Sequence, residues 1–268
     1  MKKFIVFGFV LWLSSNDAVA QELFVFTEPA SNMPANVLGG RIMTSFMEEE
    51  DGGTNFHLMP EIMYGINSKL MIHGQVFISN RNGGLLGEGG SVYAQYKFLN
   101  NDDVKQHFRM AAYGRASYNN ADIHQDEIEL VGHNSGFEAG IIATQLLHKV
   151  AVSSSLSFEQ AMNNGKNLFP AGHADNAMNY TFSIGKLMLP RKYTGYKQTN
   201  FNLMLEFLGQ RLNANGKSYL DIAPSVQFIF FSRARLDIGY RHQIYSDMER
   251  TAPNGFILRL EYNFYNVF

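Results

Sequence analysis

The sequence contains no cysteine, which excludes disulfide bonds and thiolate metal sites. Its apolar run Phe4 to Leu13 is too short to be a transmembrane helix, because the run has about ten residues and a spanning helix needs roughly twenty. Charged residues make up only 17% of the chain, the net charge is −2, and no basic cluster occurs. These absences argue against nucleic acid as a partner.

The first residues have the three-part pattern of a secretory signal. Lys2 and Lys3 precede the apolar run, and Ala18-Val19-Ala20 forms a small-x-small cleavage site. We therefore expect a Sec signal peptide at residues 1–20 and a mature domain at residues 21–268. The stretch 21–35 is apolar enough to enter that domain as a plug, and it can equally remain outside as a short periplasmic segment.

Aromatic residues and glycine are what the chain has in abundance, with 22 Phe, 13 Tyr and 24 Gly. The mean hydropathy is nevertheless slightly negative, at −0.16. An aromatic-rich chain that is not apolar overall is typical of a β-structure with one face in lipid and the other in water.

The C-terminal stretch shows the clearest period-two pattern. Phe256, Leu258, Leu260, Tyr262 and Phe264 alternate with mostly polar neighbours. Such a strand, with Phe268 as the last residue, is similar to the signal that the barrel assembly machinery reads, so we expect Tyr262, Phe264 and Phe268 to form it. Spanning strands of roughly 9–11 residues are longer than those of soluble sheets.

The same alternation recurs along the chain and predicts an all-β fold, a transmembrane antiparallel β-barrel of about twelve strands. Short connections at 65–69, 147–148 and 231–234 contrast with long polar ones at 119–134 and 161–176, as expected of periplasmic turns and extracellular loops. The strands are expected near residues 36–47, 54–66, 69–80, 89–99, 106–118, 135–146, 149–160, 177–189, 199–211, 217–230, 233–246 and 255–268.

Charged residues of both signs fall on the inward parity of these strands. One interpretation is a salt-bridged network that braces the interior, and the other is a selectivity constriction in a pore. Both need the same residue types at the same parity. The selectivity candidates are Glu61, Arg109, Arg115, Glu206, Asp221, Arg241, Arg259 and Glu261, and Lys97, Glu138, Glu159, Arg235 and Asp237 share their parity.

Several segments resemble a family of exported barrels, the outer-membrane transporters related to the MetA pathway of phenol degradation. The resemblance lies in the run Tyr219 to Phe228 with its Pro-x-Val-Gln-Phe motif, in Arg235 to Tyr240, in Asn202 to Glu206 followed by Gly209, and in Met59 to Gly65. It implies an outer-membrane barrel that transports aromatic or other small hydrophobic compounds. It supplies no catalytic or ligand residues.

Two chemistries compete with transport. His57, Met59 and His73 share inward parity on adjoining strands, and their imidazole and thioether groups suit a soft metal such as copper. His133 and Ser135 form an H-x-S pair similar to that of outer-membrane lipases, but the expected third residue of a triad is missing. A polar loop end and a lumen filled by methionine explain these residues more simply.

We therefore expect a barrel in the outer membrane of a Gram-negative cell, in contact with lipids and lipopolysaccharide, without cofactor or catalytic site. Passive passage of a small solute is the leading function. The alternatives are a lipolytic barrel built on His133 and Ser135, and a structural or surface-interaction barrel with a plugged lumen.

Overall fold

The computed structural model describes residues 24–48, 54–81, 84–103, 106–192, 195, 197–265 and 267. The expected signal peptide at residues 1–20 and Phe268 of the expected assembly signal lie outside these residues. Among the described residues, no helix is long and apolar enough to cross a bilayer.

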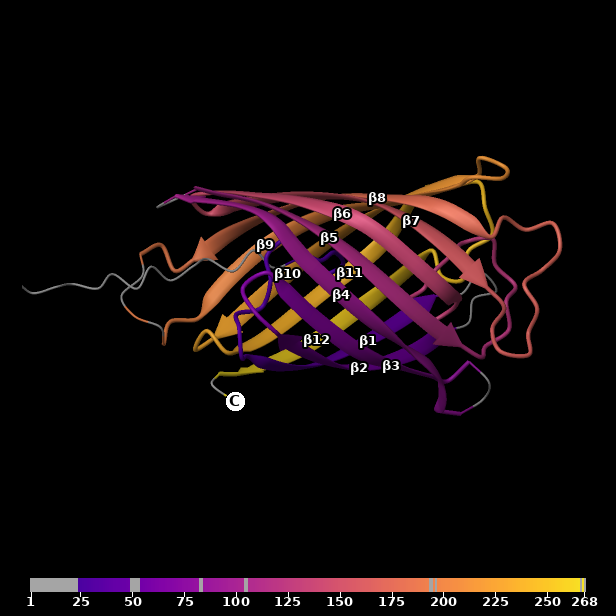
Figure 1. Cartoon of the computed structure of the whole chain (residues 1–268), viewed down its shortest axis with the longest axis horizontal. Coiled ribbons are helices and arrows are strands. Elements are labelled where there is room, and N and C mark those ends of the chain that lie inside the picture. The colour runs from indigo at the N-terminus through magenta and orange to yellow at the C-terminus, as the bar shows by residue number, and fades with distance from the viewer. Residues whose placement is uncertain are drawn as a thin grey trace, which may run out of the picture.

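Twelve antiparallel strands form one closed barrel, in which each strand pairs with its neighbours in sequence and β1 pairs with β12 (Figure 1). The predicted fold class is confirmed. The strands are β1 (Leu38–Glu48), β2 (Thr54–Gly65), β3 (Leu70–Ser79), β4 (Leu86–Asp103), β5 (Gln106–Asn119), β6 (Ser135–Leu147), β7 (Val150–Met162), β8 (Asn176–Leu189), β9 (Asn200–Leu212), β10 (Ser218–Phe230), β11 (Ala234–Ser246) and β12 (Asn254–Phe264).

Alternation of side chains separates an outer apolar face from an inner polar one. On β12, Phe256, Leu258 and Leu260 are exposed on the outside, while Arg259 and Glu261 between them are buried. Apolar residues such as Ile62, Val92 and Phe182 extend the outer face around the barrel. In hydrocarbon, every backbone amide of such a wall must be paired internally, and closure of the barrel achieves this.

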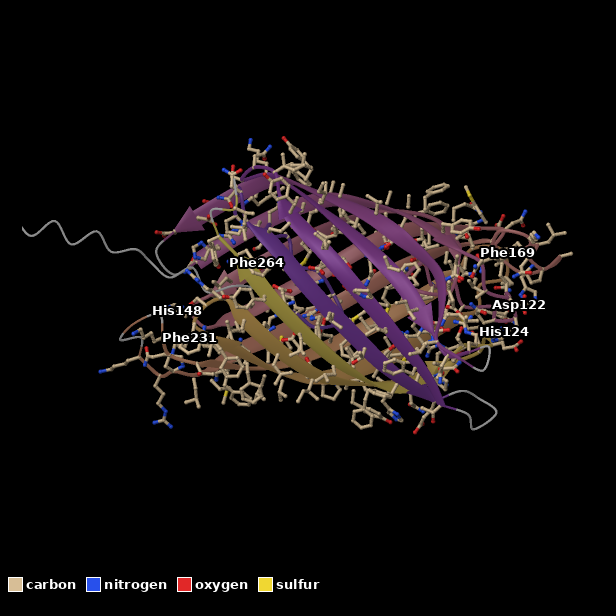
Figure 2. The ribbon with its side chains drawn as sticks, turned by 90° about the horizontal axis from the view of Figure 1, so that it is seen from below. Asp122, His124, His148, Phe169, Phe231 and Phe264 are labelled. Carbon is tan, nitrogen blue, oxygen red and sulfur yellow. The ribbon has the colours of Figure 1, made fainter. Side chains whose placement is uncertain are left out.

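The two ends of the barrel differ. His148 and Phe231 mark tight turns at one end, which we call the turn end, and Asp122, His124 and Phe169 mark long connections at the other, the loop end (Figure 2). The backbone φ is positive in these turns, at 57° for His148 and 53° for Phe231. Two-residue turns with positive φ are favoured in hairpins because their backbone twist matches that of the flanking strands. In an outer-membrane barrel the turn end faces the periplasm.

Strand boundaries deviate from the predicted ones where strands leave the apolar belt. β4 runs on to Asp103, where it pairs with Gln106 of β5, although the alternation of apolar residues ends at residue 99. Residues 100–103 of β4 are polar and exposed, so hydropathy carries no signal for this extension. β12 ends at Phe264, four residues earlier than expected.

Candidate functional site

The N-terminal segment, residues 24–34, lies inside the barrel at the turn end and is held by side chains of the wall. Its anchor is Glu206 on β9. One carboxylate oxygen accepts the amides of Val25 and Phe26 at 2.9 and 3.0 Å, and the other accepts the amide of Thr27 at 2.9 Å. Arg259 on β12 donates to the carbonyls of Val25 and Phe24. Wall side chains thus form the hydrogen bonds that a neighbouring strand would otherwise supply to the backbone of the N-terminal segment.

The second half of the segment is held in the same way. Gln95 on β4 donates to the carbonyl of Pro29 at 3.0 Å, the amide of Ala30 donates to Thr144 at 2.9 Å, and Arg109 donates to the hydroxyl of Ser31 at 2.8 Å. Near the start of the segment, Phe24 and Val25 pack with apolar side chains of the wall, which are Leu146, Ala151, Met204 and Ile257.

At the loop end, the connection between β5 and β6 folds into the lumen. We call residues 120–134 the inner loop. Ile128 exchanges two hydrogen bonds with Gln210 on β9, at 2.9 and 2.7 Å, and packs with Leu130 against Leu212 and Tyr219. The inner loop therefore obstructs the lumen from the side opposite to the N-terminal segment.

A buried ion cluster fastens the inner loop. Glu127 of the loop accepts hydrogen bonds from Arg250 at 3.0 Å and Arg241 at 3.2 Å, and both arginines also bind Asp221 on β10. The guanidinium of Arg250 lies 3.8 Å from the ring centre of Tyr219. Every charge in the cluster has an opposite partner, as burial requires. The sequence indicates only a long polar connection at residues 119–134, whereas Asp126 and Glu127 of this connection are buried.

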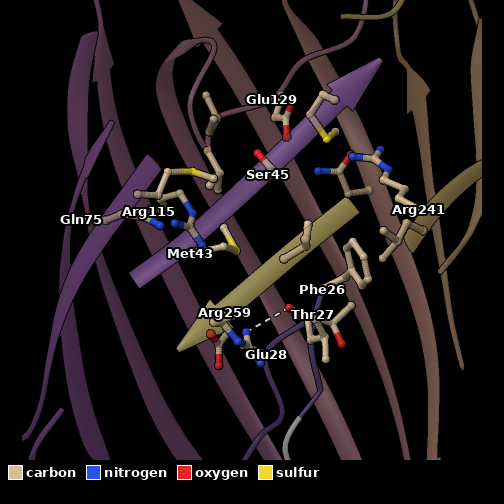
Figure 3. Close-up of a pocket in the computed structure, with 18 of the residues that line it drawn as sticks. Phe26, Thr27, Glu28, Met43, Ser45, Gln75, Arg115, Glu129, Arg241 and Arg259 are labelled. Carbon is tan, nitrogen blue, oxygen red and sulfur yellow. Dashed lines mark hydrogen bonds between the residues drawn. The ribbon is translucent and has the colours of Figure 1, made fainter. Parts of the chain in front are cut away.

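A cavity of about 240 Å³ remains between the N-terminal segment and the inner loop (Figure 3). We call it the central cavity. Val25 to Glu28 line it from the turn end, residues 127–131 line it from the loop end, and the wall contributes Arg41, Arg115, Arg241 and Arg259. Apolar side chains, among them Met43, Met59 and Ile257, form part of its surface.

A second cavity, of about 280 Å³, lies on the turn side of the N-terminal segment and is lined by residues 28–34. Glu28, Arg41 and His73 line both cavities. The carboxylate of Glu28 is 2.8 Å from Arg41. This ion pair thus borders both spaces.

The inward charges form a network along β10 to β2. Arg41 binds Glu61 and Glu261, each at 3.0 Å, in addition to Glu28. Arg235 binds Glu261 at 2.7 Å, and Asp237 lies 2.6 Å from Arg259. These ion pairs agree with the salt-bridged network of one interpretation of the sequence. Arg41, Glu61, Glu261 and Arg259 also line one or both cavities.

The predicted selectivity residues all point into the lumen, but they do not form one ring. Arg41 joins Glu61 and Glu261, Arg250 joins Asp221 to the loop, and Glu206 and Arg259 hold the N-terminal segment. Arg109 lies near the turn end, where it binds Asp102 and Ser31. Arg115 pairs with Glu138 at 3.3 Å.

The predicted metal candidates are separated. His73 binds Glu61 at 2.8 Å, whereas the ring of His57 lies 4.9 Å from that of His133. In the pairing of β2 with β3, His73 lies opposite Met63, whereas His57 lies opposite Ser79, six residues further along the strands. Among the described residues, no group of three or more His, Cys, Asp or Glu side chains is arranged to hold a metal ion.

His133 and Ser135 do not form a nucleophile and base pair. His133 uses Nδ1 for Glu129, at 2.9 Å, and its Nε2 has no partner among the described residues. The hydroxyl of Ser135 exchanges hydrogen bonds with the backbone of Asn119. Both residues are buried, although they have the parity of Phe137, which is exposed on the outer face, because the inner loop turns inward before β6 begins.

Sequence reasoning missed Glu28, Glu127 and Arg250. All three lie in connections or in the N-terminal segment, where no strand parity assigns a direction to a side chain. The inward charges on β10 to β12 are balanced, with three arginines and three carboxylates, so charge counting on the strands gives no signal for these additional residues. The set is Arg235, Arg241, Arg259, Asp221, Asp237 and Glu261.

No family model matches this chain, and no curated protein matches it. Solved structures do. A "KdgM porin" matches with a TM-score of 0.54 and 10% identity, over 85% of this chain and 99% of that one. The COG4313 outer membrane channel from Pseudomonas putida F1 matches with a TM-score of 0.55 and 12% identity, over 90% of this chain and all of the other. The chain thus has the fold of outer-membrane porins, and its apolar outer face places it in the outer membrane.

Proposed function

We propose that this barrel is a passive outer-membrane channel for a small solute and that the described state is its closed form. The observation that carries the proposal is the central cavity, which lies on the axis of a closed barrel and is bounded by two segments that are not part of the wall. A barrel that served only as a scaffold needs no such space.

The solute is small and partly apolar. The cavity of about 240 Å³ lies below the roughly 300–1,000 Å³ of drug-sized ligand sites. Methionine, isoleucine and Phe26 supply an adaptable apolar surface beside the ion pairs. A hydrophobic or aromatic compound, as the resemblance to the phenol-degradation barrels implies, suits this surface.

The N-terminal segment acts as the gate. It is joined to the wall chiefly by hydrogen bonds to side chains, whereas the wall itself is a complete ladder of backbone hydrogen bonds. Withdrawal of the segment toward the turn end therefore leaves the barrel intact and joins the two cavities.

Conductance in a planar bilayer tests the proposal. Refolded protein that begins at residue 21 is compared with a variant that begins at residue 35, and heat-modifiable gel mobility establishes that both are folded. We expect brief, rare openings in the longer protein and steady conductance in the shorter one. A folded, silent barrel in both cases contradicts the channel and favours a structural role.

A further inference from the structure

Four arginines line the central cavity, and three of them are occupied. Arg41 binds three carboxylates, Arg259 binds Asp237 and two backbone carbonyls, and Arg241 binds Asp221 and Glu127. Arg115 differs. Only its Nε has a partner, Glu138 at 3.3 Å, and neither terminal nitrogen is hydrogen-bonded to any described residue.

We propose that the central cavity binds the carboxylate of a small aromatic or short aliphatic acid, with Arg115 and Gln75 as its binding residues. The inference rests on the proposed function, since it names the class of solute that the channel admits.

Arg115 is held in position without the use of its terminal nitrogens. Its guanidinium lies 5.1 Å from the ring centre of Tyr93, and the carboxylate of Glu138 is itself fixed by the hydroxyl of Tyr113 at 2.6 Å. Because the planar guanidinium presents two parallel N–H groups, it binds a carboxylate in bidentate fashion. A side chain fixed before the ligand arrives loses little entropy on binding.

Unused polar groups lie beside Arg115. The amide of Gln75 on β3 and the hydroxyl of Ser45 on β1 line the same cavity, and neither has a side-chain hydrogen bond among the described residues. β4 alone separates β3 from β5, with Gln75 opposite Ser91 and Arg115 opposite Tyr93. Figure 3 shows Arg115 and Gln75 at the same side of the cavity. A second donor is therefore available to a carboxylate on Arg115.

The acidic side chains of the cavity do not prevent this binding, because each is engaged. Glu28 and Glu61 bind Arg41, Glu127 binds Arg241 and Arg250, Glu129 binds His133, and Glu159 accepts a hydrogen bond from Gln210 at 3.2 Å. The body of the acid meets the apolar part of the surface, which includes Val25, Phe26, Met43 and Ile257.

Calorimetry with three probes of equal size tests the proposal on refolded protein that begins at residue 21. The probes are benzoate, neutral benzamide and cationic benzylammonium. We expect benzoate to bind at least tenfold more tightly than either of the others. In Arg115→Gln, benzoate affinity falls by roughly 10- to 100-fold and benzamide affinity is unchanged, as expected for loss of a charge-assisted pair.

Arg211→Gln is the matched control, since Arg211 is an exposed arginine at the loop end, and it leaves benzoate affinity unchanged. Equal affinity for benzoate and benzamide, a preference for benzylammonium, or no effect of Arg115→Gln overturns the proposal. Calorimetry does not depend on conduction. Conductance without benzoate binding contradicts the proposed binding site. Benzoate binding by a protein that stays silent without residues 21–34 contradicts the proposed channel.

Discussion

Glu206 and Thr27 are joined twice through one carboxylate oxygen, which accepts the backbone amide at 2.9 Å and the hydroxyl at 2.8 Å. Glu206 is fully buried on β9, and Thr27 belongs to a segment that has no strand partner. Glu206 thus anchors Thr27 within the segment that separates the central cavity from the turn end.

Glu206→Gln should loosen the N-terminal segment. A carboxamide has one accepting oxygen, so its NH₂ group faces N–H donors that the carboxylate accepted. We expect docking of the segment to weaken by roughly 1.5–3 kcal/mol, the range for hydrogen bonds to a charged group. Hydrogen exchange at the amides of Val25 to Thr27 measures the change. Glu48→Gln, at an exposed position of β1, is the control, and equal protection in both variants refutes the anchoring role.

Arg250→Ala should release the inner loop. Its guanidinium binds both Glu127 and Asp221, whose side chains are almost completely buried. Removal of one partner from such a cluster leaves buried charges uncompensated and costs roughly 3–5 kcal/mol. We expect rapid proteolysis within residues 120–134. Arg233→Ala removes a guanidinium that lies against the ring of Tyr265 at the turn end and should leave the loop protected. Similar cleavage of both variants would count against the cluster as a fastener.

Acid should also loosen the inner loop. Burial tends to raise the pKa of Glu129, but the charge and hydrogen bond of His133 outweigh it and lower that pKa from 4.5 to about 2. A carboxylate with a lowered pKa stabilises the docked loop above its ordinary pKa, and this contribution disappears as the pH falls from about 4.5 to about 2. Hydrogen exchange of the loop at pH 5 and pH 3 should therefore show faster opening at pH 3.

The variant Glu129→Gln separates this effect from other titrations. Burial tends to raise the pKa of Asp126, but the hydrogen bond from Lys217 outweighs it and lowers that pKa, and Asp126 remains in the variant. We expect the pH dependence of loop opening to become smaller but not to vanish. The same slope in the wild type and the variant shows that Glu129 makes no contribution.

Ser135→Ala should affect stability rather than chemistry. The hydroxyl bonds the backbone of Asn119, so its loss costs roughly 1 kcal/mol of barrel stability. Because the hydroxyl of Ser135 is bound to the backbone of Asn119 and Nε2 of His133 has no partner among the described residues, we expect no hydrolysis of phospholipid by either the wild type or the variant. Phospholipid hydrolysis that survives purification and is abolished in Ser135→Ala would restore the lipolytic alternative.

The barrel wall was predictable because lipid imposes a strict pattern. Residues such as Leu258 and Arg259 must face opposite sides of a spanning strand, so parity alone identified every inward charge that was named. Twelve strands and their order follow from that alternation and from the turns between them.

The interior was much less predictable. Parity states that Arg41 and Arg241 point inward, but it does not identify all their partners, because these include Glu28 from the N-terminal segment and Glu127 from the inner loop. Hydropathy treats the inner loop as a solvated acidic stretch. Only its closure onto Arg241 and Arg250 makes it part of the interior.

The most direct test of the account is a reversible lock on the N-terminal segment. The hydroxyls of Thr27 and Ser183 are 2.9 Å apart, so the two side chains are neighbours at which a disulfide between Thr27→Cys and Ser183→Cys can be tried, and no natural cysteine interferes. We predict that the oxidised double variant is silent in a planar bilayer, that a reductant produces conductance, and that neither single variant responds. Equal conductance before and after reduction, with the disulfide shown to have formed, contradicts the claim that this segment closes the lumen.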